Sequence, residues 1–348
     1  MKKLGVGIVG FGRIGAEHAD WLGRCAGIEA RGVVDATEAR CEMARRRGLV
    51  VFGDVREMLG DSRIDVVLVA TPTGMHFEHV MGALLANKHV MVEKPMGLDL
   101  GESRGMVEEA ERRGVVLSVF HCRRWDVDFL TVLSVVGSGR LGKIVNVESR
   151  LGQWGSCVGP AAKEWRPGWR NEAAFGGGGL YDWGSHFVDQ IWRLMLPARP
   201  VRVFAQLRGN VWTTDCDDLA RVCIDFDSGA VGLVEINTTT TRPLARWHLD
   251  GTGGGVESPF SLEFDVKRWA ELSFTVAGGG SAEMIPVASG GLSEVEIWER
   301  FAGAVRGEGE AAVSARSVLP TMALLDAARE SSRKGCAVEL SLDLRWEL

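Results

Sequence analysis

The amino-acid sequence predicts a doubly wound parallel α/β domain followed by an α+β domain with a mainly antiparallel sheet. Over about the first 120 residues, short apolar segments alternate with segments of helical periodicity, as expected for parallel strands joined by right-handed helical crossovers. After about residue 125, longer segments of alternating polarity follow one another with turns between them. This second pattern favours antiparallel strands.

The N-terminal elements follow from these patterns in chain order. The segment 64–70 (IDVVLVA) is almost wholly apolar, as a strand covered on both faces must be. Strands are predicted over residues 4–10, 28–35, 64–70, 89–93 and 115–120, and helices over 14–25, 37–47, 75–87 and 99–113.

The C-terminal part begins with an amphipathic helix predicted over 127–136, which ends at Gly137. Strands are predicted over 143–151, 201–209, 219–226 and 230–241, and helices over 295–305 and 318–334. We therefore predict a nucleotide-binding domain at residues 1–122 and a substrate-binding and oligomerisation domain at residues 123–348.

Composition and charge exclude several classes of protein. The chain is 46% hydrophobic and 25% charged, with a formal net charge of -6 and no long basic block, so we expect no nucleic-acid partner. Uninterrupted apolar segments stay below the roughly 18 residues of a membrane span, so we expect no membrane partner. Seven scattered cysteines without a C-x-x-C pair argue against disulfides and zinc and favour a cytoplasmic location.

The segment Gly10-Phe11-Gly12-Arg13-Ile14-Gly15 is a G-x-G-x-x-G between a predicted strand and a predicted helix. Gly10 allows a tight turn, Gly12 lets the backbone approach a pyrophosphate, and Gly15 lets helix and strand pack closely. Asp35 ends the next strand, where its carboxylate would bind the ribose hydroxyls and repel a 2′-phosphate. The pattern predicts an NAD site, with NADP less favoured. The alternative, a glycine-rich turn without a dinucleotide, is disfavoured because strand, glycines, helix and Asp35 are all present.

Two further segments carry candidate chemistry. Glu93-Lys94-Pro95 follows a predicted strand, at the end where open α/β sheets bind ligands; by itself, Lys94 could be a solvated loop lysine. Asp182 and His186 are four residues apart after four glycines, so on a helix they would share a face. By themselves, they could be a helix-capping carboxylate and an ordinary buried histidine.

Taken together, four motifs in this order resemble the Gfo/Idh/MocA oxidoreductases. They are the glycine turn, Ala70-Thr71-Pro72-Thr73 with His76, Glu93-Lys94-Pro95, and the Asp182-x-x-x-His186 pair. The resemblance implies an N-terminal Rossmann domain, a C-terminal domain built on an open antiparallel sheet, and a homodimer or homotetramer. It also implies hydride transfer on sugars, inositols or related polyols, with cofactor contacts from Arg13, Ile14, Thr71, Pro72, His76, Glu93 and Lys94.

The same resemblance assigns roles to Lys94, Asp182 and His186. In the oxidation direction His186 would take the hydroxyl proton, and Lys94 would stabilise the developing charge on the same oxygen. Asp182 would orient His186 or anchor a neighbouring hydroxyl. Whether Lys94 or His186 is the principal acid-base group stays open.

Aromatic and basic residues near the predicted Asp182 helix suggest a substrate pocket. Five tryptophans fall between residues 154 and 192, namely Trp154, Trp165, Trp169, Trp183 and Trp192. Most are expected in the core, and Trp169, Arg170 and His121 are the candidates for substrate contacts. No histidine spacing supports a metal site. Two other functions stay open: an NAD-retaining enzyme that cleaves glycosides, and a non-catalytic NAD- or sugar-binding regulator.

Overall fold

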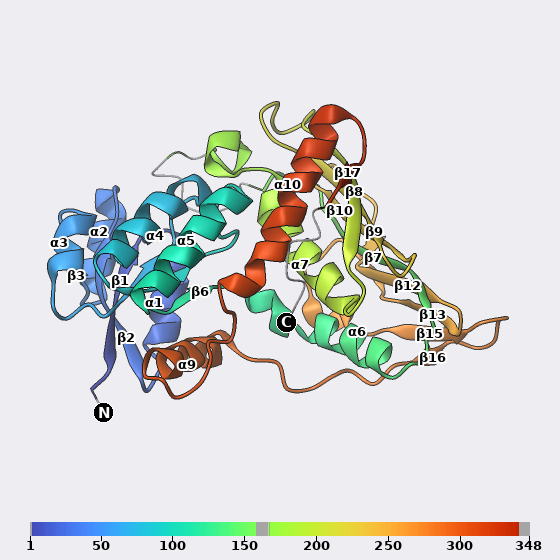
Figure 1. The fold of residues 1–348 in the computed structure, drawn as a ribbon, viewed down its shortest axis with the longest axis horizontal. Coiled ribbons are helices and arrows are strands. Elements are labelled where there is room, and N and C mark those ends of the chain that lie inside the picture. The colour runs from blue at the N-terminus through green and yellow to red at the C-terminus, as the bar shows by residue number, and fades with distance from the viewer. Residues whose placement is uncertain (1, 158–165, 167, 341–348) are drawn as a thin grey trace.

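The computed structural model describes residues 2–157, 166 and 168–340 of the 348-residue chain. Two sheets lie side by side with helices between and around them (Figure 1). Within the described ranges, no helix combines the length and the apolar character needed to cross a bilayer.

The first sheet has six parallel strands in the order β3-β2-β1-β4-β5-β6. The chain runs outward from β1 to β3 on one side and then from β4 to β6 on the other, so the strand order reverses next to β1. Such a switch point opens a crevice at the carboxyl ends of the strands. The strands are β1 (Leu4–Val9), β2 (Ile28–Val34), β3 (Val50–Val51), β4 (Val66–Val69), β5 (His89–Val92) and β6 (Leu117–Val119).

Five helices connect these strands: α1 (Arg13–Leu22), α2 (Glu38–Arg46), α3 (Val55–Gly60), α4 (His76–Leu85) and α5 (Leu100–Arg113). β3 and α3 were not predicted from the sequence. Both are short, two and six residues long, so hydrophobic periodicity has too few positions to reveal them.

The second sheet has nine strands in the order β16-β15-β13-β12-β7-β10-β9-β8-β17. Every neighbouring pair is antiparallel except β7 and β10, which run parallel. The four predicted strands are β7 (Ile144–Gly152), β8 (Pro200–Arg208), β9 (Leu219–Phe226) and β10 (Val231–Asn237). The strands of this sheet that were not predicted are β12 (Trp247–Gly251), β13 (Gly254–Glu257), β15 (Ser273–Val276), β16 (Glu283–Met284) and β17 (Val338–Glu339).

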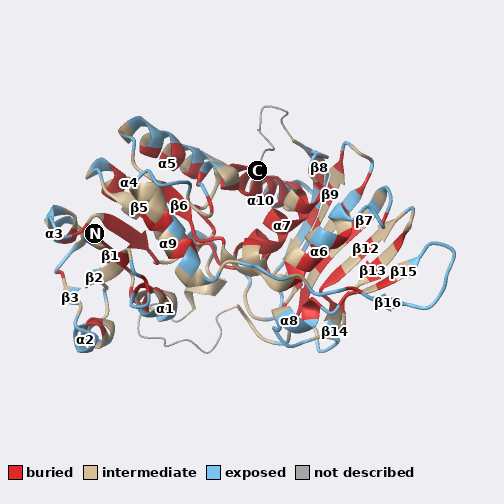
Figure 2. Ribbon diagram, turned by 90° about the horizontal axis from the view of Figure 1, so that it is seen from below, coloured by how far each residue is buried: buried red, intermediate tan, exposed pale blue. Residues whose placement is uncertain are grey.

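Helices α6 (Val127–Gly137), α7 (Ser185–Leu194) and α10 (Leu319–Lys334) lie on the side of the second sheet that faces the first domain (Figure 1). Their apolar side chains and those of the sheet form one core with α4 and α5. Figure 2 shows the buried residues along these elements. The predicted fold class, a doubly wound parallel sheet plus a domain with an open, mainly antiparallel sheet, is confirmed.

One C-terminal helix packs on the first domain. Ile297, Trp298 and Phe301 of α9 (Glu294–Val305) share a buried core with Leu22 of α1. A helix from the C-terminal part of the chain thus packs on the N-terminal domain. The domain division at residues 1–122 and 123–348 stays a prediction. In space, α9 lies against α1 (Figure 1).

Candidate active site

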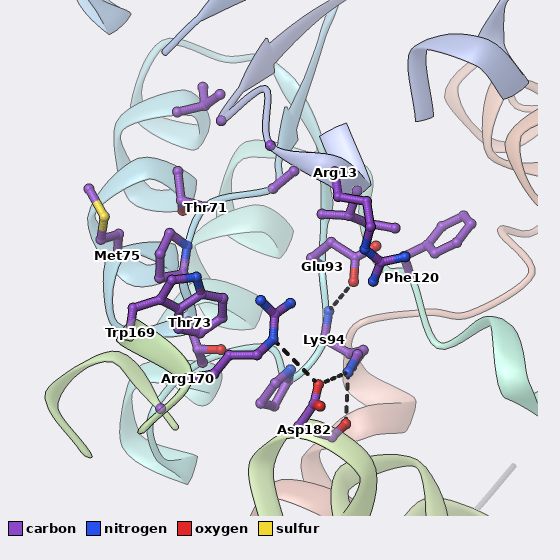
Figure 3. Close-up of a pocket in the computed structure, with 18 of the residues that line it drawn as sticks. Arg13, Thr71, Thr73, Met75, Glu93, Lys94, Phe120, Trp169, Arg170 and Asp182 are labelled. Atoms are coloured by element: carbon purple, nitrogen blue, oxygen red, sulfur yellow. Dashed lines mark hydrogen bonds and ion pairs between the residues drawn. The ribbon is translucent and has the colours of Figure 1, made fainter. Parts of the chain in front are cut away.

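A cavity of about 930 Å³ lies between the carboxyl ends of the parallel strands and the segment before α7 (Figure 3). Residues from the glycine turn, from the ends of β2, β4 and β5, and from the C-terminal domain line it. Among the predicted site residues, those on its wall are Gly10, Gly12, Arg13, Ile14, Asp35, Thr71, Pro72, Glu93, Lys94, Trp169, Arg170, Asp182 and His186. Gly15, His76 and His121 are not among the lining residues.

The glycine turn forms a backbone cradle at one end of the cavity. Gly10 has φ of 91°, and a Cβ there would lie 2.8 Å from the Ala70 carbonyl oxygen. A Cβ on Gly15 would lie 2.1 Å from the Gly10 carbonyl oxygen, so both positions exclude a side chain. Gly12 is the N-cap of α1 and leaves the helix N-terminus open toward the cavity. Such a terminus is suited to a pyrophosphate.

Asp35 lies where the second strand ends, with its carboxylate fixed by the backbone. Its Oδ2 accepts the Phe11 N–H at 2.6 Å and its Oδ1 accepts the Thr37 N–H at 2.8 Å. Arg40 of α2 also lines the cavity, with a guanidinium nitrogen 3.7 Å from Asp35 Oδ2. Arg40 was not among the predicted site residues, although it lies in the first turn of the helix that follows Asp35.

His76 lies behind the wall and ties two loops together. Its ring nitrogens are each 2.9 Å from a carbonyl oxygen, one of Pro95 and one of Thr71. The side chain is buried, and burial lowers its pKa. The structure therefore connects His76 to both cofactor-side turns, and a direct cofactor contact by this residue stays a prediction.

Lys94 extends from the end of β5 to the C-terminal domain. The peptide bond between Lys94 and Pro95 is cis. The Lys94 ammonium donates to the Asp182 carbonyl oxygen at 2.7 Å and to Asp182 Oδ1 at 3.3 Å (Figure 3). Arg170 approaches the same carboxylate, with Nε 3.9 Å from Oδ1. Two cations thus share one carboxylate on the cavity wall.

Asp182 belongs to a π-helical turn, Leu180–Gly184, that leads directly into α7. Asp182 and His186 were expected on one face of an ordinary α-helix. A π-helical turn has i→i+5 hydrogen bonds. Residues four apart therefore need not share one face there, as they would on an α-helix. The recorded contacts of the Asp182 carboxylate are to Lys94 and Arg170. Its predicted role in orienting His186 stays a prediction.

Asp217 holds this turn in place. Its Oδ2 accepts the Leu180 N–H at 2.8 Å, and a Cβ on Gly178 would lie 2.4 Å from its Oδ1. Burial raises the pKa of Asp217 to about 6. Asp217 was not among the predicted site residues, but the four consecutive glycines were a signal that another group approaches the chain closely there.

His186 lies on α7, buried apart from the side that lines the cavity. Its Nδ1 is buried without a hydrogen-bond partner in the described part of the chain, which leaves Nε2 for a group in the cavity. Burial and the positive charges of Lys94, Arg123 and Arg246 lower its pKa well below the usual value. His186 is therefore a neutral imidazole at neutral pH, the form that can accept a proton.

His121 lies next to His186, away from the cavity surface. The two rings are 5.1 Å apart in an edge-to-face arrangement, and neither His121 nitrogen has a hydrogen-bond partner among the residues described. Burial lowers the pKa of His121 to about 4. The predicted direct substrate contact stays a prediction, because the described cavity wall does not include His121.

We expect His121→Asn to make stability less sensitive to acid. An unfolded histidine takes up its proton near pH 6.5, whereas the folded His121 does so only near pH 4. Between these values protons favour the unfolded state, by about 1.4 kcal/mol per pH unit for this one group. Urea unfolding at pH 7.5 and 5.5 measures this effect. The free energy of unfolding should fall less between these two pH values in the variant than in the wild type. An equal loss in both proteins would show that His121 does not stay neutral in the fold.

The expectation that most of the tryptophans between residues 154 and 192 lie in the core is wrong for the described ones, since Trp192 alone among them is fully buried. Trp169 and Trp183 line the cavity, and the Arg170 guanidinium lies 4.3 Å from the centre of the Trp169 ring. Trp192 is fully buried and Trp154 is largely exposed. Trp165 lies outside the described residues.

Comparisons with known proteins agree with this geometry. A model of the Gfo/Idh/MocA oxidoreductase family, NAD-binding Rossmann fold, matches residues 4–121, and a model of the family's C-terminal domain matches residues 129–257. An NADP(+)-dependent scyllo-inositol 2-dehydrogenase of Bacillus subtilis is 28% identical over 301 residues, covering 82% of this chain and 81% of that protein.

A second enzyme of Bacillus subtilis, an NAD(+)-dependent scyllo-inositol 2-dehydrogenase, is 28% identical over 96% of both chains. Among solved structures, an NAD-binding protein from Listeria innocua has a TM-score of 0.85 and 27% identity, over 97% of both chains. The two family models together cover most of the chain. Lys94 lies within the first matched range and Asp182 within the second. The chain belongs to the Gfo/Idh/MocA family of oxidoreductases.

Proposed function

We propose that the protein is an NAD-dependent dehydrogenase or reductase that acts on the CH–OH group of a sugar, an inositol or a related polyol. One observation carries this proposal. Lys94, Asp182 and His186 line the same cavity as the glycine turn, and Lys94 bonds to Asp182. The names of the relatives, scyllo-inositol dehydrogenases, support the class of substrate.

The side chains divide the chemistry between them. The nicotinamide, when bound, supplies the hydride acceptor or donor. In the oxidation direction the neutral His186 accepts the hydroxyl proton, and Lys94 donates a hydrogen bond to the same oxygen as its negative charge develops. Asp182 fixes the Lys94 ammonium at 2.7 and 3.3 Å through its carbonyl and carboxylate oxygens. In the reduction direction His186 returns the proton.

The residues of the glycine end support a dinucleotide with a free 2′-hydroxyl. Asp35 lines the cavity as a nearly buried carboxylate, and this charge would repel a 2′-phosphate. Arg40 offsets part of that charge at 3.7 Å. Because the relatives include both NAD and NADP enzymes, the preference of this chain for NAD is part of the proposal.

Asp35→Ala is expected to weaken the binding of NAD. It should also reduce the discrimination against NADP by about tenfold or more, since it removes the repulsive charge but leaves Arg40. The measurement is kcat/KM, or the Kd of each cofactor, for both dinucleotides. Glu38→Ala, a carboxylate on the exposed side of α2, is the matched control and should leave the ratio unchanged. Unchanged selectivity in Asp35→Ala would mean that another group reads the ribose.

The proposed activity is tested by screening sugars, inositols and sugar acids for absorbance in the NADH band, with NAD and with NADP. A substrate-dependent rise that is lost in His186→Ala supports the dehydrogenase. Release of free sugar without reduced cofactor would instead support a glycoside-cleaving enzyme that recycles NAD. Tight cofactor binding without turnover in either direction would support a regulator.

A homo-oligomer in the cytoplasm completes the proposal. The face of the nine-stranded sheet away from α6, α7 and α10 carries exposed Phe204 and Val231, at 39% and 40% exposure. Across the strands of the same face, Arg202 pairs with Asp225 at 2.7 Å. An apolar and charged face of this kind suits a second copy of the chain. All seven cysteines are unpaired, which fits a reducing compartment.

A further inference from the structure

A buried carboxylate lies at the floor of the cavity, next to the Lys94 turn. Glu93 follows the last residue of β5, lines the cavity and is 7% exposed. Its Oε1 lies 2.9 Å from His18 Nε2, and its Oε2 accepts the backbone N–H of Lys94 at 3.1 Å. Both oxygens of the carboxylate are therefore engaged.

The protonation state of His18 follows from its second neighbour. The Trp298 indole Nε1 lies 3.0 Å from His18 Nδ1. An indole N–H can only donate, so His18 Nδ1 must be the acceptor and the ring proton must be on Nε2. His18 is thus a neutral imidazole that donates to Glu93. The rings of Trp21, Phe120 and Trp298 enclose it, and its exposure is 0%.

The charge on Glu93 has no cation bonded to it within the described ranges. The Lys94 ammonium is directed to Asp182 (Figure 3), and His18 is neutral. Burial alone would raise the pKa of Glu93, but the hydrogen bonds from His18 and from the Lys94 N–H, together with the charge of the Lys94 ammonium, lower it. Glu93 is therefore an anion at neutral pH. A buried charge without a counter-ion is costly, so a cation that enters the cavity beside it would be strongly favoured.

The location of Glu93 indicates which part of a ligand would lie beside its carboxylate. The carboxyl ends of β1, β4 and β5 meet beside the switch point, where a dinucleotide-binding sheet holds its ligand. A nicotinamide ring is positively charged when oxidised and neutral when reduced. We propose that Glu93 is the electrostatic partner of the oxidised nicotinamide, and that His18 and Trp298 are positioning residues that keep it ionised. This inference rests on the proposed use of a nicotinamide cofactor and adds a preference for its oxidised form.

The test is the ratio of the dissociation constants of NAD⁺ and NADH, since the two forms differ in the charge of one ring. NADH affinity is measured by its fluorescence and NAD⁺ affinity by competition, both without substrate. Glu93→Gln should weaken the binding of NAD⁺ by about tenfold or more relative to the binding of NADH. Any local rearrangement around the new amide affects both forms alike and cancels in the ratio.

Glu17→Gln is the matched control. Glu17 also lines the cavity, but it is exposed and paired with Arg13 at 2.9 Å. Loss of its charge should leave the ratio of the two dissociation constants unchanged, because water screens it.

Two replacements of His18 test the positioning role. His18→Gln keeps a neutral N–H donor for Glu93 and should keep the wild-type ratio. His18→Leu removes the donor, raises the pKa of Glu93, and should shift the ratio toward NADH as the pH is lowered from 8 to 6. A thermal melt of each variant establishes that it is folded.

The outcomes separate this inference from the proposed function. Equal weakening of both cofactor forms in Glu93→Gln, or an unchanged ratio, would overturn the electrostatic role of Glu93. A shifted ratio in His18→Gln equal to that in His18→Leu would overturn the positioning role of His18. Failure of the wild type to bind either form would refute the proposed nicotinamide function itself.

Discussion

Lys94→Ala is expected to lower kcat by about 10²–10³-fold, the range for removal of one donor to a developing oxyanion. The Kd of NAD should change little, because the glycine cradle and Asp35 hold the other end of the dinucleotide. The loss of kcat is expected because Asp182 holds the Lys94 ammonium at the reacting end of the cavity, at 2.7 and 3.3 Å. Steady-state kinetics and cofactor titration of the purified variant measure the two quantities.

Two controls sharpen this prediction. Lys94→Arg keeps the charge but replaces a compact ammonium by a planar fork, so it should restore only part of the rate. Lys267→Ala removes an exposed lysine of α8 (Val266–Trp269) and should leave kcat unchanged. A Lys94→Ala enzyme with full activity would reject the role given to this residue.

Asp189→Ala is expected to destabilise the protein by about 3–5 kcal/mol, the cost of leaving one partner of a buried ion pair alone. Asp189 accepts two hydrogen bonds from the Arg124 guanidinium, at 2.7 and 2.8 Å, and a third from Thr321 Oγ1 at 2.7 Å. Both charged side chains are almost fully buried. The pair joins the segment after β6 to α7 and α10, so its loss should loosen the junction that positions His186. Urea unfolding at pH 7.5 measures the loss.

A double variant separates the unpaired charge from the loss of packing. Arg124→Met combined with Asp189→Leu removes both charges and should recover much of the stability lost in Asp189→Ala. A loss below about 1 kcal/mol in Asp189→Ala would contradict this account, because it would place the pair in the range of solvent-exposed ion pairs.

The glycine turn was predictable because the residues that form it are local in sequence. Gly10, Gly12 and Gly15 fall within six consecutive residues, and the backbone of one turn decides what they do. Asp35 follows from the next strand by the same reasoning. Several core strands were also predictable from their alternation or apolar character, whereas β12, which carries the fully buried Trp247 and Leu249, was missed.

The parts that sequence reasoning missed depend on contacts between distant residues. Asp217 accepts a hydrogen bond from Leu180, directly after the four glycines, from 37 positions further along the chain. His18, Glu93 and Trp298 come together from three separate segments, which no motif spacing reveals. His121 was expected at the cavity surface because its strand ends there, but its ring lies behind His186. The π-helical turn at Asp182 likewise depends on packing around it, so an α-helical spacing was the natural assumption.

Transfer of deuterium tests the central claim most directly. Inositols and sugars that carry deuterium on the carbinol carbon are incubated with the protein and NAD, and the reduced cofactor is analysed by mass spectrometry. The account predicts that each compound oxidised delivers its deuterium to the nicotinamide ring, and that His186→Ala abolishes the transfer. Reduced cofactor without deuterium, or consumption of the compound without reduced cofactor, would contradict hydride transfer from the alcohol carbon at this site.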